Sequence, residues 1–316
     1  GEYELKLKLP DEVSCLASHS IGFRILSANG NGITEYLSTD FGVSMTGHWY
    51  KLNPAGPESQ SGSAVLDDDV YVVEGNLTSP NTKFWRYYAA YDQWARLADY
   101  PAYAPPDQAL IVCSGEIYAG FASLPDQNTN FFMYNREYNI WISKAKLPAT
   151  INIGTITTVT ISKRIYAFIA GSNQKGIYEP ETDTWTMSPC SVPNFDANTT
   201  VFNYQGSYYF FKGANSDKLY RYDLAGETFI PVTISGLKNK SSCFFKLGNK
   251  YFCTDKCKVY ELDMEEKKLV WHPELSNYMA AFDFYNEDNA SMFSLNNNAY
   301  FIFDPHILLM LSTENK

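Results

Sequence analysis

Few residues in this chain have the type and spacing that catalysis or metal binding requires. The four histidines, His19, His48, His272 and His306, lie far apart in the sequence, and none has the His-x-x-x-His spacing of a metal site. No convincing Ser-x-x-x-Lys or glycine-rich phosphate-loop pattern is present either. We therefore predict no catalytic residue, no metal site and no cofactor, and a protein that is not an enzyme.

The cysteines suggest one site of covalent chemistry. Cys15, Cys113 and Cys243 fall in apolar stretches that read as innermost strands, where a cysteine is a small buried residue. Cys253 and Cys257 instead flank "TDK" at an expected hairpin tip, where two facing cysteines can satisfy disulfide geometry. A Cys253–Cys257 disulfide is the candidate. A pair of isolated thiols and a metal site are the alternatives, and the metal site lacks two of the ligands that zinc prefers.

Two further patterns depend on their surroundings. The acidic run Asp67–Asp69 could suggest a calcium site, but it falls between two short strand-like stretches, so a simple turn is favoured. Sequons for N-glycosylation occur at Asn76, Asn198, Asn239 and Asn289, and they matter only if the chain is secreted. Asn76 would then be the most accessible glycosylation site.

The elements that position these residues repeat along the chain. A turn followed by an aromatic-led apolar strand recurs, as in "DDDVYVVEG" and "SKRIYAFIAG". The leading aromatic residues are spaced 42 to 49 residues apart, and they are Phe23, Tyr71, Tyr118, Tyr166, Tyr208, Tyr251 and Tyr300. This period is typical of a four-stranded propeller blade.

A second half of each unit repeats as a third strand, a turn and a fourth strand led by an aromatic residue. The units end at Trp94, Trp141, Trp185, Phe229 and Trp271. The stretch from Leu262 to Val270 has a partly helical spacing but is rich in charge, and we interpret it as a solvated hairpin tip.

The two ends of the sequence suggest how the array closes. The last unit has three strand-like stretches and lacks a Trp-led fourth, whereas Tyr3–Leu9 alternates apolar and polar residues as a half-buried strand does. Unpaired edge strands at both ends would promote aggregation. We therefore predict that Tyr3–Leu9 completes the last blade and closes a ring.

Stretches such as "IYEPETDTW" and "FFMYNREYNIW" make the sequence similar to the kelch-repeat family of β-propellers, with degenerate repeats. This resemblance implies an all-β propeller of four-stranded antiparallel blades, and the seven leading aromatic residues predict seven blades in a single domain over residues 1–316. Six blades are the alternative, if the weak unit around Phe23 is not a full blade.

Charge and hydropathy exclude several classes of partner. The formal net charge is −10, which argues against nucleic acid, because phosphate binding requires a basic surface. No apolar run approaches the roughly 20 residues of a membrane span. No signal peptide is visible, but Gly1 can be a processed terminus, so this observation does not decide the compartment. We expect a cytoplasmic location, with secretion as the alternative.

The longest connecting segments all belong to one expected face of the ring, and several carry aromatic residues. Because tyrosine is enriched at interface cores, we select Tyr103, Asp126, Tyr278 and Phe284 as candidate binding residues. The predicted function is a non-enzymatic binding scaffold for a protein or peptide, with a basic partner favoured by the acidic side chains. A secreted carbohydrate-binding or sugar-processing propeller is the alternative.

Overall fold

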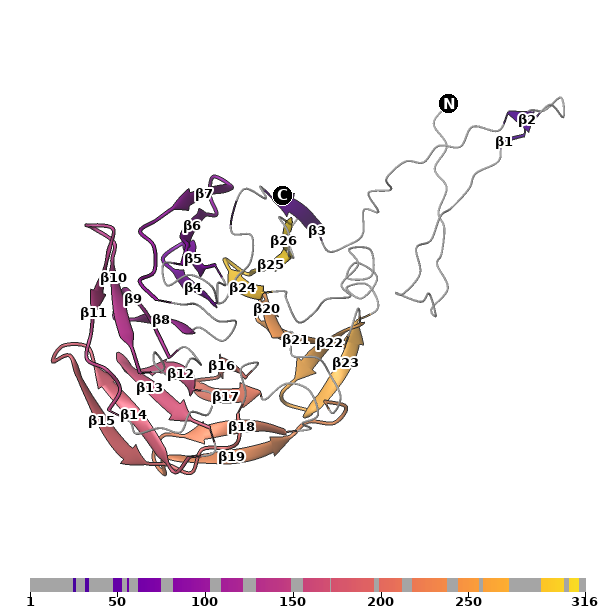
Figure 1. The fold of residues 1–316 in the computed structure, drawn as a ribbon. Coiled ribbons are helices and arrows are strands. Elements are labelled where there is room, and N and C mark those ends of the chain that lie inside the picture. Colours follow the sequence, from indigo (N-terminus) through magenta and orange to yellow (C-terminus); the bar gives the residue numbers. More distant parts are fainter. Residues whose placement is uncertain are drawn as a thin grey trace.

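The computed structural model of the protein describes short β-strands and the turns between them (Figure 1). The described residues are 25–26, 32–33, 48–52, 56, 62–74, 82–102, 109–121, 129–148, 156–170, 172–195, 199–211, 218–237, 244–255, 258–272, 291–303 and 307–312. Among these residues the structure contains no helix that is long and apolar enough to cross a membrane.

Six four-stranded antiparallel sheets stand around a common axis, so the described residues form a six-bladed β-propeller (Figure 1). Blade 1 consists of β4 (Gly62–Leu66), β5 (Asp69–Val73), β6 (Phe84–Tyr88) and β7 (Gln93–Arg96). Blade 2 consists of β8 (Ala109–Cys113), β9 (Glu116–Gly120), β10 (Phe131–Asn135) and β11 (Ile140–Ser143). Blade 3 consists of β12 (Ile156–Ile161), β13 (Arg164–Ile169), β14 (Gln174–Glu179) and β15 (Thr184–Pro189). Blade 4 consists of β16 (Thr200–Tyr204), β17 (Ser207–Phe211), β18 (Lys218–Asp223) and β19 (Thr228–Thr233). Blade 5 consists of β20 (Phe244–Leu247), β21 (Lys250–Asp255), β22 (Lys258–Asp263) and β23 (Lys268–His272). Blade 6 consists of β24 (Ser291–Leu295), β25 (Asn298–Phe303), β26 (Ile307–Ser312) and β3 (His48–Leu52).

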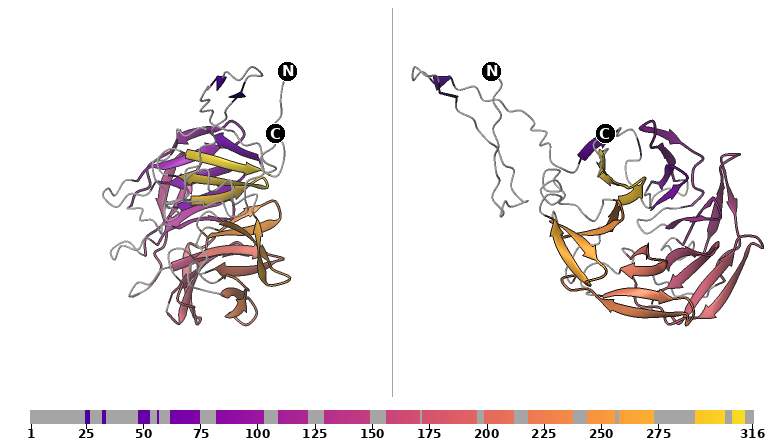
Figure 2. Two further views of the ribbon diagram at one scale, coloured as in Figure 1. Left: turned by 90° about the vertical axis from the view of Figure 1, so that its right-hand side faces the viewer. Right: turned by 180° about the vertical axis from the view of Figure 1, so that it is seen from behind.

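The ring is closed by β3, which is the fourth strand of blade 6. It pairs antiparallel with β26, and Figures 1 and 2 show the two strands side by side although their colours come from opposite ends of the chain. Closure by a strand from the N-terminal side is thus confirmed, but the prediction that Tyr3–Leu9 supplies it is wrong. Alternation identifies a half-buried strand but not its partner, and Tyr3–Leu9 lies outside the described residues.

The prediction of seven blades is also wrong, and the six-bladed alternative is correct. The weak unit around Phe23 was counted as a blade, but β1 (Ile25–Leu26) pairs only with β2 (Gly32–Ile33), in a separate two-stranded sheet. The remaining six leading aromatic residues all lie in the second strands of blades, as expected.

The turns between first and second strands are uniformly tight. Each contains two residues, and both have positive φ in turns such as Ser114–Gly115 and Asn296–Asn297. Two-residue turns with positive φ match the right-handed twist of the strands that they join. Asp67 and Asp68 form one of these turns, which confirms the interpretation of the acidic run.

The fourth-strand aromatic residues share one register in most blades. Trp94, Trp141 and Trp185 lie opposite Tyr87, Tyr134 and Tyr178, and in the closing strand Trp49 lies opposite Leu311. Blade 5 departs from the expectation, because Leu269 occupies this place opposite Leu262. Trp271 lies two residues further along β23 and is 45% exposed.

The hydrophobic core is divided among the junctions between blades. Tyr71 and Phe84 of blade 1 pack against Tyr134 of blade 2, and Tyr118 of blade 2 packs against Tyr178 of blade 3. Such tilted and edge-on aromatic contacts stabilise each junction beyond the area that they bury.

The buried tyrosines make the stability of the folded protein pH-dependent in the alkaline range. Burial raises the pKa of Tyr118 and of Tyr134 to about 12, from an ordinary value of 10.0. Because the pKa is higher in the folded state than in the unfolded state, the neutral tyrosines stabilise the folded protein fully below about pH 10. This stabilisation is lost as the pH rises towards 12. We expect the denaturant midpoint to fall over this interval. The Tyr118→Phe/Tyr134→Phe variant should show a shallower fall, and an unchanged slope would contradict the assignment.

Candidate functional site

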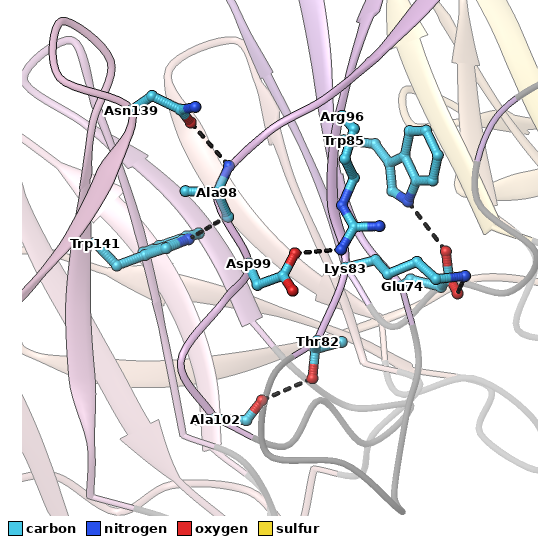
Figure 3. A network of polar contacts seen from close by, with 10 residues as sticks. All are labelled: Glu74, Thr82, Lys83, Trp85, Arg96, Ala98, Asp99, Ala102, Asn139 and Trp141. Carbon is cyan, nitrogen blue, oxygen red and sulfur yellow. Dashed lines mark hydrogen bonds and ion pairs between the residues drawn. The ribbon is translucent and has the colours of Figure 1, made fainter.

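A hydrogen-bonded clasp fixes blade 2 to blade 1. In blade 2 the Asn139 Oδ1 accepts hydrogen bonds from the Tyr134 hydroxyl (2.7 Å) and from the Ala98 N–H (2.8 Å), and Trp141 Nε1 donates to the Ala98 carbonyl (3.1 Å). Ala98 belongs to the segment that leaves blade 1, so the clasp joins the hairpin of blade 2 to the preceding blade (Figure 3).

The same clasp recurs between blades 2 and 3. Asp183 Oδ1 accepts from the Tyr178 hydroxyl (2.7 Å) and the Ala145 N–H (2.9 Å), and Trp185 Nε1 donates to the Ala145 carbonyl (2.8 Å). Burial works against the Asp183 carboxylate, but these two hydrogen bonds and the nearby Lys144 hold its pKa below the ordinary value. The φ of Asp183 is 53°, a left-handed conformation that Asp and Asn tolerate well.

The junction between blades 3 and 4 replaces the clasp with a buried charge. Glu227 stands where Asp183 stands in blade 3, and its carboxylate lies 2.8 Å from the Lys175 Nζ. The Lys175 side chain is fully buried, whereas Glu227 is half exposed. The Nζ makes no aligned hydrogen bond within the described residues, so the contact is an ion pair only. Cys190 is buried at the same place, and its Sγ lies 3.5 Å from the Glu227 carbonyl oxygen.

The two faces of the ring differ in their connections. On one face, which we call the tight-turn face, first and second strands are joined by two residues, and the third and fourth strands of blades 1 to 5 are joined by four. On the opposite face, the long-loop face, the connections range from two residues to the 18 between His272 and Ser291. Variation in length is therefore concentrated on the long-loop face, as the sequence predicted.

At blade 1 the stems of two long connections are bound together (Figure 3). Glu74, directly after β5, accepts a hydrogen bond from Trp85 Nε1 (3.0 Å) and pairs with Lys83 (2.8 Å). The Thr82 hydroxyl donates to the Ala102 carbonyl at 2.7 Å, across to the connection between blades 1 and 2. The segments that contain Asn76 and Tyr103 thus leave the ring from neighbouring, hydrogen-bonded positions.

The candidate binding residues themselves lie outside the described residues. These are Tyr103, Asp126, Tyr278 and Phe284, together with the glycosylation candidate Asn76. The structure places the stems of their segments on the long-loop face, and their role in binding stays a prediction.

The candidate disulfide also stays a prediction. Cys253 is buried in β21, and the register places Tyr260 opposite it rather than Cys257, which lies outside the described residues. Of the three cysteines expected in innermost strands, Cys113 is buried in β8 as expected, whereas Cys15 and Cys243 lie outside the described residues.

Sequence reasoning missed a cluster on the tight-turn face between blades 1 and 2. Asp67 and Asp69, interpreted as turn residues, pair there with Arg136 and Arg86. Neither arginine stood out in the sequence, because the two lie 50 positions apart and meet only through the fold. Within the described chain no group of three or more His, Cys, Asp or Glu could hold a metal ion, and His272 Nε2 lies 2.9 Å from the Glu261 carboxylate.

The fold and these surfaces define a β-propeller with two unlike faces. No family model and no curated protein sequence matches the chain, so membership of the kelch-repeat family stays a prediction. A solved structure entitled "Structure of YjhT" is similar, with a TM-score of 0.55, 12% sequence identity and coverage of 82% of this chain and 94% of that chain. At this identity the similarity shows the fold alone.

Proposed function

We propose that this propeller is a non-enzymatic binding scaffold that recognises a protein or peptide on its long-loop face. The observation that carries the proposal is the asymmetry of the ring: uniform two- and four-residue turns on one face, and connections of up to 18 residues on the other. Connections of variable length on a rigid scaffold are where binding residues concentrate in many folds.

The stems support this interpretation. Glu74, Thr82 and Ala102 hold two long segments of blade 1 in fixed starting positions, and ordered stems reduce the entropy lost when a loop binds. Of the aromatic candidates, Tyr103 comes from the connection between blades 1 and 2, whereas Tyr278 and Phe284 both come from the connection between blades 5 and 6. A net charge of −10 favours a basic partner and faster association at low salt.

The proposal is tested by affinity capture of peptides or proteins in parallel with a glycan array. For a captured partner, Tyr103→Ala and Phe284→Ala should each weaken binding by about 1–3 kcal/mol, as expected for aromatic anchors. Charge reversal at Asp126 should mainly slow association. Lys163→Ala and Gln205→Ala on the tight-turn face are the matched controls and should leave affinity unchanged.

The result that contradicts the long-loop site is a hydrogen-exchange footprint of that partner confined to the tight-turn face. Specific glycan binding without a polypeptide partner would replace the proposal with the carbohydrate-binding alternative.

A further inference from the structure

We propose that the tight-turn face of blades 1 and 2 is a second docking site, which receives a lysine or arginine side chain from a partner polypeptide. This site lies on the face opposite to the long-loop face and does not depend on the function proposed above.

The first observation is a hollow of about 380 Å³ at the junction of the two blades. It is lined by Arg86 on β6, Glu116 at the start of β9, and Asn135, Arg136 and Glu137 at the hairpin between β10 and β11. All the lining groups are polar or charged, so the hollow suits a charged side chain rather than an apolar anchor.

The second observation is the distribution of charge in this hollow. Both arginines already have acidic partners: Arg86 Nε donates to Asp69 at 2.9 Å, and Arg136 Nη1 donates to Asp67 at 2.7 Å. The Arg136 Nη2 donates to the Gly115 carbonyl at 3.2 Å, and the Arg86 guanidinium lies 4.3 Å from the centre of the Tyr88 ring.

Two carboxylates remain without such a partner. Among the described residues, Glu116 and Glu137 form no ion pair and no side-chain hydrogen bond. The cluster thus has four acidic groups against two arginines. A cation is attracted by this excess, whereas an anion would meet two uncompensated carboxylates.

The third observation is a pair of exposed tyrosines at equivalent turn positions. Tyr91 in blade 1 is 74% exposed and Tyr138 in blade 2 is 66% exposed. The hairpin does not require an aromatic residue here, because blades 3, 4 and 5 have Thr182, Gly226 and Glu266 at this position. Tyrosine rings attract cations through their faces and are frequent anchors of protein interfaces.

A polypeptide is a better candidate than a free metal ion. The described residues provide no group of three or more carboxylate, histidine or cysteine ligands for a metal. The exposed tyrosines instead offer contact area for the chain on either side of a docked basic residue.

Fluorescence anisotropy with a labelled peptide of alternating lysine and glycine tests the proposal. The Glu116→Gln/Glu137→Gln variant should raise the Kd at least about fivefold, because it removes the two unpaired carboxylates. Tyr91→Ser/Tyr138→Ser should also raise it. The control Glu265→Gln/Glu266→Gln makes the same change of net charge on exposed turn residues of blade 5 and should change Kd by less than about twofold.

All of these substitutions are in turns or at a strand start on the surface, and circular dichroism should confirm that each variant folds. Equal weakening by the site variant and the blade 5 control would show attraction to net charge only and would overturn the proposal. So would the absence of binding to the unmodified protein, or equal binding of a matched peptide of alternating glutamate and glycine.

Discussion

Removal of β3 is expected to lower stability by several kcal/mol and to make the protein aggregate. The comparison is between a variant that lacks residues 1–46, which keeps His48–Leu52, and a variant that lacks residues 1–53, which does not. Without β3, the backbone of β26 loses its outer pairing partner from Leu308 to Ser312. An unpaired apolar edge invites association between chains. For a domain of this size, a loss of about 3–5 kcal/mol lowers the melting temperature by roughly 5–8 °C.

The shorter deletion is the internal control for this result. Any loss common to both variants comes from residues before the closing strand, and only the difference between them reports on ring closure. Equal melting temperatures, with both variants monomeric by size-exclusion chromatography, would show that β3 is not needed for closure.

Truncation of a clasp tryptophan should lower the free energy of unfolding nearly as much as removal of β3 does. Trp185→Ala removes ring contacts with Tyr178 and Phe131, and it leaves the Ala145 carbonyl without its 2.8 Å donor. We expect a loss of about 3–5 kcal/mol in the free energy of unfolding, measured by denaturant titration. Trp141→Ala should give a similar value, because Trp141 makes the same bond to Ala98 at 3.1 Å.

Trp271 is the matched control for the clasp. It is also a fourth-strand tryptophan, but it lies outside the clasp register and is 45% exposed, so Trp271→Ala should cost less than about 1 kcal/mol. Trp185→Phe keeps only part of the ring packing and also removes the N–H donor, so its loss of stability should lie between those of Trp271→Ala and Trp185→Ala. If Trp185→Ala costs no more than Trp271→Ala, the clasp does not hold the blades together.

The sequence predicted the blades because their strongest signals are local. Tyrosines such as Tyr118 and Tyr166 lead second strands at a regular spacing, and two-residue turns require residues that accept positive φ. It could not predict the partner of the closing strand, because both Tyr3–Leu9 and His48–Leu52 carry apolar residues and the choice depends on pairing with β26.

The wrong register predicted for Trp271 has a different physical origin. A shift of two residues along a strand returns a side chain to the same face, so alternation cannot distinguish Leu269 from Trp271. The observed pairing of β22 with β23 places Leu269 opposite Leu262 and so distinguishes the two residues. Likewise, Arg86 and Arg136 come together only across the blade junction, and no spacing in the sequence relates them. The segments of the long-loop face contain the aromatic candidates, but sequence alone fixes neither their conformation nor their ligand.

The position of β3 also sets a time at which the native state can be completed on the ribosome. Leu52 and Ile307 are separated by 254 residues, so the closing strand is synthesised long before its partner. At roughly 5–20 residues per second, β3 waits about 13–50 s while blades 1 to 5 emerge and fold in turn. During that interval its polar backbone groups and its tryptophan lack their final neighbours, and the nascent chain is most exposed to chaperones and proteases until β26 leaves the exit tunnel.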